Sequence, residues 1–171
     1  MTRVKELVAG ETELDRVWGR RGDYFRLFMS DYRKSLSNLD PVLVELSRLR
    51  ISSMVESRFD SSIRYVPARE AGLSEMKISL LEDYPSSGLF SERERIVLEF
   101  TEQWVIQSSS ISDEDVDRVQ TVLTPEEFIY FCKALSVMDQ FARANSIFDI
   151  EPSNCVSGEL FEFESILETS D

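Results

Sequence analysis

The sequence predicts an all-α fold, an antiparallel helical bundle, and three observations lead to this prediction. Apolar side chains recur at helical spacing in almost every segment of the 171 residues. Residues that cap helix N-termini precede those segments, as Asp40 precedes Pro41. Glycine (6) and proline (5) are scarce, which disfavours a turn-rich all-β fold. The length fits a single domain, which we place at residues 1–152, followed by an acidic tail at 153–171.

The N-terminal half is expected to form several helices. The stretch 12–35 has apolar side chains at helical spacing, and the sequence GRRG at 19–22 is expected to divide it into two helices. The helix that Asp40 caps has a wide apolar stripe, which indicates deep burial. A further helix is expected from Ser57 to Gly72, and Pro67 within it should kink or restart it. The stripe of the Asp40-capped helix consists of Val44, Leu46, Leu49, Ile51 and Val55.

The chain after Gly72 contains four further helix starts. Ser91 and Glu94 form a capping box, in which each side chain satisfies a backbone N–H of the other residue. The longest helix is expected to run from Pro125 to about Phe148. No strand pattern of useful length appears. The residues that cap these four helices are Ser74, Ser91, Ser112 and Thr124.

The charge distribution excludes several classes of partner. The net charge is −13, so we expect neither nucleic acid nor anionic membrane as a partner. No apolar run approaches the roughly 20 residues of a membrane span, and the charged N-terminus lacks a signal-peptide core, so a cytoplasmic location is expected. The segment from Glu151 to Asp171 contains no lysine or arginine. Its apolar part, ELFEFESIL at 159–167, is suited to docking on the body or on a neighbouring subunit.

The chain contains no histidine, which restricts its chemistry sharply. The usual general base at neutral pH is missing, so Ser-His-Asp and Cys-His nucleophiles are excluded. We expect no metal site and no cofactor. Cys132 and Cys155 lie too far apart for a Cys-x-x-Cys motif. Cys132 stands in an apolar run and is expected to be a buried, inert thiol, whereas Cys155 is interpreted as a free thiol in the tail.

Three stretches in this order resemble one known group of proteins. They are LDPVLVELSRLRIS at 39–52, AREAGLSEMKISLL at 68–81 and FSERERIVLEF at 90–100. Together with the long final helix, they resemble the alkyl hydroperoxidase D-like and carboxymuconolactone decarboxylase superfamily over roughly residues 12–152. The resemblance implies a helical bundle of the alkyl hydroperoxidase D type. It also implies assembly into homo-oligomers such as dimers, trimers or hexamers.

The resemblance also implies where an active site would lie. Thiol-active members have a glutamate on the first core helix and then a Cys-x-x-Cys-x-x-x-His motif. With Gly72 as the reference point, that glutamate corresponds to Glu45. Both cysteines and the histidine are replaced, in that order, by Ser57, Asp60 and Arg64. Phe59 falls where some members have an additional relay histidine. Because a disulfide cycle needs two thiols, we expect no thiol peroxidase activity.

The residues that remain predict a candidate site without redox chemistry. Glu45, Asp60 and Arg64 are the candidate catalytic residues: a carboxyl pair for proton transfer and an arginine fork for an anionic substrate. Such a set suits a cofactor-independent enzyme, a lyase or isomerase acting on a small organic acid. A specialised metabolic pathway would be a fitting context. The candidate pocket residues are Ser57, Phe59 and Tyr65.

The same residues also have a structural interpretation. Ser57 and Asp60 fit a capping box, and Asp60 and Arg64 fit an (i, i+4) salt bridge on one helix. Glu45 fits an ion pair with Arg48 or with Arg64. On this interpretation the protein is a catalytically silent homo-oligomeric binding or scaffold protein of the same fold. The sequence leaves both hypotheses open.

Overall fold

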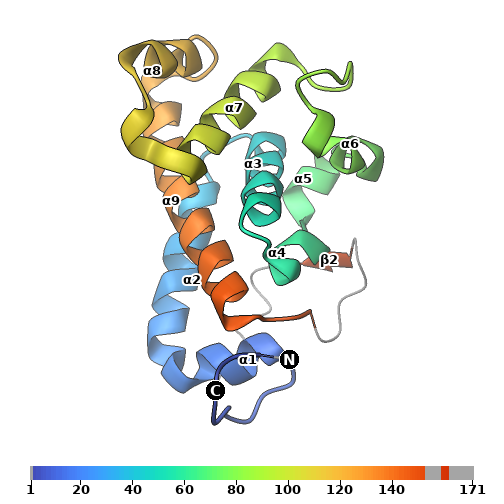
Figure 1. The fold of residues 1–171 in the computed structure, drawn as a ribbon, viewed down its shortest axis with the longest axis vertical. Coiled ribbons are helices and arrows are strands. Elements are labelled where there is room, and N and C mark those ends of the chain that lie inside the picture. Colours follow the sequence, from blue (N-terminus) through green and yellow to red (C-terminus); the bar gives the residue numbers. More distant parts are fainter. Residues whose placement is uncertain (1, 153–158, 162–171) are drawn as a thin grey trace.

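The computed structural model describes residues 2–152 and 159–161. Its helices surround α3, which lies in the centre of the molecule between α7, α9 and α5 (Figure 1). The longest helix, α9, packs along α2 on one side and against α3 on the other. The α-helices are α1 (Glu13–Trp18), α2 (Gly22–Leu36), α3 (Pro41–Met54), α4 (Arg58–Ser62), α5 (Val66–Glu70), α6 (Glu75–Ser79), α7 (Glu92–Gln107), α8 (Asp113–Gln120) and α9 (Pro125–Phe148). Three short 3-10 helices are η1 (Gly19–Arg21), η2 (Leu81–Asp83) and η3 (Ser108–Ser110).

The helix starts confirm most of the sequence predictions. Asp40 accepts a hydrogen bond from the N–H of Val42 and has Pro41 directly after it. Complete capping boxes form at the starts of α7, α8 and α9, with Ser91, Ser112 and Thr124 as the capping residues. The sequence GRRG divides the first helical stretch, since η1 separates α1 from α2. Local cap chemistry therefore fixes these boundaries, as the sequence indicated.

The core contains a cluster of aromatic rings centred on Phe141 of α9. The Phe141 side chain is 1 % exposed, and its ring centroid lies 5.6 Å from that of Phe28 and 5.7 Å from that of Tyr32. These contacts join α9 to α2, and Phe59 joins α4 to the same cluster. The predicted stripe on α3 lies in the core as well, apart from Val55, which is only partly buried. The four buried members of the stripe are Val44, Leu46, Leu49 and Ile51.

The predicted helix from Ser57 to Gly72 is not continuous. The chain leaves the helical conformation after Ser62, is extended over β1 (Ile63–Tyr65), and starts a new helix at Val66. Pro67 explains the break, because in a continuous helix its ring would clash with the carbonyl group of residue 63. That carbonyl instead accepts hydrogen bonds from Arg48 and Arg64. Of the two outcomes predicted for Pro67, the structure has the restart.

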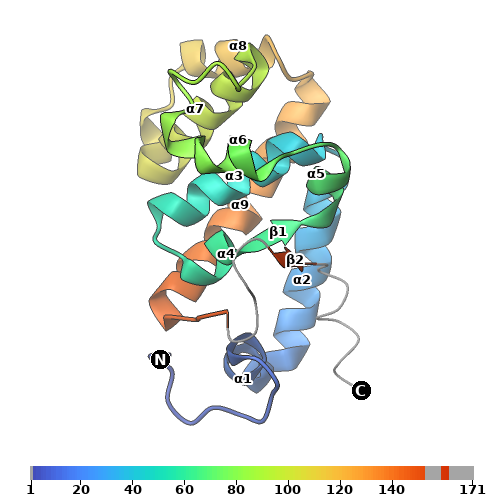
Figure 2. The ribbon, with the colours of Figure 1, turned by 90° about the vertical axis from the view of Figure 1, so that its right-hand side faces the viewer.

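A second short strand, β2 (Glu159–Phe161), pairs with β1 in parallel, and the two lie side by side in Figure 2. The expectation of no useful strand pattern missed this pair, because a three-residue strand is too short to show a period in the sequence. The remaining tail residues, 153–158 and 162–171 with Cys155, lie outside the described residues. Every helix in the described part of the chain is too short or too polar to span a lipid bilayer.

Candidate functional site

A buried ion pair within α3 stands at the centre of the candidate site. Arg48 donates from Nε to Glu45 Oε2 at 2.7 Å and from Nη2 to Glu45 Oε1 at 2.8 Å. The two residues are three positions apart on a helix, so their side chains share a face. Glu45 is 0 % exposed and Arg48 is 2 % exposed. The fork geometry satisfies both carboxylate oxygens inside the protein, which a buried charge requires.

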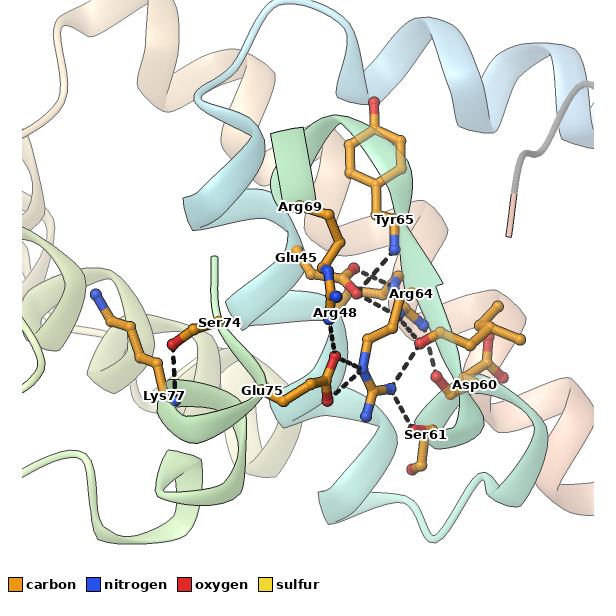
Figure 3. A network of polar contacts seen from close by, with 11 residues as sticks. Glu45, Arg48, Asp60, Ser61, Arg64, Tyr65, Arg69, Ser74, Glu75 and Lys77 are labelled. Carbon is orange, nitrogen blue, oxygen red and sulfur yellow. Dashed lines mark hydrogen bonds and ion pairs between the residues drawn. The ribbon is translucent and has the colours of Figure 1, made fainter. Parts of the chain in front are cut away.

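The same ion pair also holds the strand β1 in place (Figure 3). The backbone N–H of Tyr65 donates to Glu45 Oε1 at 3.0 Å. Arg48 donates from Nη2 to the carbonyl of Ile63 at 2.9 Å and from Nη1 to the carbonyl of Asp60 at 2.7 Å. The helix ends at Ser62, so these backbone groups have no hydrogen-bond partner within a helix. The side chains of Glu45 and Arg48 on α3 bind them instead.

The carboxyl group of Asp60 belongs to a second set of buried hydrogen bonds. Its Oδ2 accepts from Ser57 Oγ at 2.5 Å and from Asn145 Nδ2 at 3.0 Å. Asn145 Oδ1 in turn accepts from Trp18 Nε1 at 3.1 Å. This chain of contacts ties α4 to α9 and α1. Burial raises the pKa of Asp60, although the bonds from Ser57 and Asn145 oppose the shift.

Arg64 is turned away from these two carboxyl groups. Its Nε donates to both carboxylate oxygens of Glu75 at 3.2 Å, and its Nη1 donates to the carbonyls of Ser61 and Ile63 at 2.8 Å. Arg69 binds the same Glu75 carboxylate (Figure 3). Within the described residues, no ion pair joins Arg64 to Glu45 or Asp60. The structural hypothesis of an Asp60–Arg64 salt bridge is therefore wrong, and the ion pair of Glu45 is with Arg48.

The three candidate pocket residues have different surroundings. Ser57 is 1 % exposed and caps α4, but its partner Asp60 does not return the bond to the Ser57 N–H, so the predicted capping box is only half formed. The Ser57 N–H donates to the carbonyl of Ser52 instead. Phe59 is 4 % exposed and packs edge-on against Phe141 in the core. Tyr65 is half-buried, and burial together with the charge of Glu45 raises the pKa of its hydroxyl.

Three residues of this cluster, Arg48, Asn145 and Tyr32, were not predicted as site residues from the sequence. The sequence analysis gave Arg48 only as one of two possible ion-pair partners of Glu45. Its position three residues after Glu45 on an apolar helix could have indicated a buried ion pair. Asn145 is 1 % exposed and lies one turn after Phe141 on the buried face of α9, where a lone amide signals a hydrogen-bonded network. Tyr32 is 0 % exposed, and burial, followed by the charges of Arg48, Asp60 and Glu45, influences the pKa of its hydroxyl. In the sequence, Tyr32 is one of several aromatic residues at helical spacing, and this pattern does not indicate a charged neighbour.

One open groove lies apart from this cluster, at the end of α3 between α7 and α9. Its volume is about 390 Å³, which is within the range of small-molecule sites. Five of its lining side chains are apolar, and Arg143 and Ser146 add polar groups. The apolar members are Met54, Val55, Val105, Ile106 and Ile147. Within residues 2–152 and 159–161, no group of three or more carboxylate or thiol side chains is arranged to hold a metal ion.

Comparison with known proteins defines the class of fold. A crystal structure from Agrobacterium tumefaciens matches with a TM-score of 0.73 at 19 % sequence identity, covering 90 % of this chain and 100 % of that chain. That protein is described as being of unknown function and as a putative antioxidant defence protein AhpD. The chain therefore has the alkyl hydroperoxidase D-like helical fold, which confirms the fold that the resemblance implied.

A relative is also found by sequence. The uncharacterized protein YnjA of Escherichia coli (strain K12) is 28 % identical over 138 residues, which cover 79 % of this chain and 76 % of that protein. No family model matches the chain.

The raised pKa of Asp60 predicts a specific pH dependence of stability. A group whose pKa is higher in the folded state favours folding below its unfolded pKa of about 3.9, and this contribution is lost as the pH rises through the folded pKa. Asp60→Asn cannot ionise, so its stability relative to the wild type should rise as the pH increases above about 4. Urea denaturation of both proteins at several pH values measures this difference.

The matched control for this experiment is Asp115→Asn. Hydrogen bonds from Ser112, first from its backbone N–H and then from its hydroxyl, lower the pKa of Asp115 to about 2. This variant should therefore show the opposite trend, losing stability relative to the wild type as the pH rises from about 2 to 4. A constant difference between Asp60→Asn and the wild type at all pH values would mean that Asp60 is hydrated rather than buried.

Proposed function

We propose that the protein is a catalytically silent, homo-oligomeric binding or scaffold protein with an alkyl hydroperoxidase D-like fold. The observation that carries this proposal is the buried Glu45–Arg48 ion pair. It occupies the region in which the resembled superfamily places its active site, and both carboxylate oxygens of Glu45 are taken by protein donors. A general base needs a free lone pair within reach of a substrate, and a base this well satisfied does not offer one.

The chemistry of the replaced motif supports the absence of thiol peroxidase activity. Ser57, Asp60 and Arg64 stand where the thiol-active pattern has two cysteines and a histidine. Among the described residues, the one cysteine is Cys132. Burial raises the pKa of its thiol, which disfavours the reactive thiolate. Cys132 lies on α9, about two turns into the helix, whereas Glu45 lies on α3.

Exposed apolar side chains support a role in binding. Ile106 and Ile147 both line the open groove, and each is more than half exposed. Large apolar side chains that gather on a surface mark contacts with other molecules. A second copy of the chain is the partner that the resemblance implies. The most exposed large apolar side chains of the described residues are Ile106 at 74 %, Leu27 at 73 %, Met76 and Ile129 at 69 % each, and Ile147 at 64 %.

A second candidate function is cofactor-independent proton transfer on a small organic acid, and one observation favours it. The carboxyl group of Asp60 is buried, and burial raises its pKa. A raised pKa favours the protonated carboxyl group, which is the form that acts as a general acid. Arg64, with 7 % of its surface exposed, is the group that would bind an anionic substrate if the ligand displaced Glu75.

One set of measurements separates the two candidates. For a silent protein, a panel of small carboxylic acids at millimolar concentration should leave the melting temperature unchanged, and light scattering should give a multiple of the chain mass. Organic peroxide with a dithiol reductant should not turn over. A rise in melting temperature that is lost in Arg64→Ala but kept in the control Arg50→Ala would favour the enzyme. A monomeric mass, or peroxide turnover abolished by Cys132→Ser, would contradict the first proposal.

A further inference from the structure

The open groove between α3, α7 and α9 contains a hydroxyl group that has no hydrogen-bond partner in the described part of the chain. It belongs to Ser146, which is partly buried and lines the groove together with five apolar side chains. Ser52 and Ser136 also lie within helices, and each donates to the carbonyl group four residues earlier. The Ser146 hydroxyl makes no such bond. Because polar groups among apolar side chains are normally hydrogen-bonded, this hydroxyl is free to bind a molecule in the groove.

Arg143 supplies a second hydrogen-bond donor to the same groove. It lies three residues before Ser146 on α9, so the two side chains share a face of the helix. Its Nε donates to both carboxylate oxygens of Asp139, at 2.8 and 2.9 Å, and its Nη2 donates to the carbonyl of Val105 at 2.9 Å. Its Nη1 makes no hydrogen bond to the described residues. A guanidinium has more N–H donors than these bonds use, so Nη1 can still donate to an acceptor in the groove.

The charges around the groove favour an uncharged ligand over an anion. The charge of Arg143 is already compensated by its ion pair with Asp139. The groove is lined by the last turns of α3, α7 and α9, and the C-terminus of a helix has a partial negative charge. The whole chain has a net charge of −13. An anion would therefore enter an unfavourable potential, whereas a neutral hydrogen-bond acceptor would not.

We propose that this groove is a binding site for a small uncharged molecule with an apolar body and one carbonyl oxygen, such as a ketone or an ester. The carbonyl oxygen accepts hydrogen bonds from Ser146 Oγ and Arg143 Nη1, and the apolar body packs on side chains such as Val105 and Ile147. The volume of about 390 Å³ and the mostly apolar lining suit such a ligand. This inference names a ligand for the binding role proposed above and rests on that role. It involves no catalytic step.

Calorimetric titration of the full-length protein with 2-heptanone and with hexanoate tests this proposal. The two molecules have nearly the same shape, because hexanoate has a charged oxygen where 2-heptanone has a methyl group. We expect saturable binding of 2-heptanone, and binding of hexanoate that is at least about tenfold weaker because its charge has no partner in the groove. No saturable binding of 2-heptanone would overturn the proposal. Hexanoate that binds as tightly as the ketone would overturn the choice of an uncharged ligand.

Two serine variants of α9 locate the binding. Ser146→Ala should weaken the binding of 2-heptanone about threefold to tenfold through the loss of one hydrogen bond. Ser136→Ala is the matched control, because its hydroxyl bonds to the carbonyl of Cys132 and does not line the groove. It should leave the affinity unchanged. Equal affinities for Ser146→Ala and the wild type would overturn the proposed site.

The protein concentration separates this inference from the proposed function. An affinity for 2-heptanone that falls as the protein concentration rises would overturn the ligand and indicate that a second copy fills the groove. The proposed function itself fails on a monomeric mass or on peroxide turnover, and neither result depends on the ketone. A multiple of the chain mass without ketone binding would therefore overturn the ligand site and leave the scaffold role in place.

Discussion

Replacing Arg48 with methionine should lower the free energy of unfolding by about 3–5 kcal/mol, because it leaves the Glu45 carboxylate buried without its partner. Four hydrogen bonds are lost at the same time: two to the Glu45 carboxylate, one to the carbonyl of Asp60 on α4 and one to the carbonyl of Ile63 on β1. The loss is expected to be this large because Glu45 is 0 % exposed, so water cannot replace the guanidinium. Urea denaturation followed by circular dichroism measures the change.

The same helix supplies the matched control for this prediction. Arg50 pairs with Glu102, but its side chain is 19 % exposed and that of Glu102 is 25 % exposed. Arg50→Met removes the same type of side chain from the same helix, and its cost should stay within about 1 kcal/mol, because water can reach both members of this ion pair. Equal losses of unfolding free energy for Arg48→Met and Arg50→Met would mean that the two ion pairs do not differ in burial. The Glu45–Arg48 pair would then be accessible to water.

Phe141→Ala should lower the free energy of unfolding by about 3–5 kcal/mol, because it leaves a cavity at the centre of the aromatic cluster. The Phe141 ring is in contact with rings of α1, α2 and α4, including Trp18 at 6.1 Å and Phe59 at 6.3 Å between centroids. The loss therefore affects α4, which contains Asp60, and α9, which supplies its partner Asn145. Denaturation measures the stability, and the fluorescence of Trp18 should report the loosened packing.

The control for Phe141 lies three turns earlier on α9. Ile129 is 69 % exposed, so Ile129→Ala should change the free energy of unfolding by no more than about 0.5 kcal/mol. A loss below about 1 kcal/mol for Phe141→Ala would contradict the packing described here, since a core ring of this size is expected to cost several times more. It would mean that the site around Asp60 is already loosely packed.

Local chemistry explains which parts of the fold could be predicted from the sequence. Caps such as Ser91 and Thr124 act within a few residues, and the proline after Thr124 fixes its own backbone angle. Pro67 likewise signalled a break. The extended segment between Ser62 and Val66 could not be predicted in the same way, because its partners come from α3 and from the distant β2.

The candidate site shows the same limit. The resemblance pointed to Glu45, Asp60 and Arg64, and the structure brings Glu45 and the backbone of Asp60 together around Arg48. The contact between Asp60 and Asn145 joins residues 85 positions apart, so no spacing rule reveals it. Arg64 turns toward Glu75 because β1 is extended, and a continuous helix would have placed it one turn from Asp60. The broken helix therefore decides which charged groups meet.

The central claim is that the ion pair of Glu45 and Arg48 is inaccessible to water and stabilises the fold. A double-mutant cycle with Glu45→Met and Arg48→Met tests it most directly. If the pair is buried and coupled, the double variant should cost about 2–3 kcal/mol less than the sum of the two single variants. Single effects that add to within about 0.5 kcal/mol would show that the two side chains do not interact in a sealed interior. That result would contradict the claim.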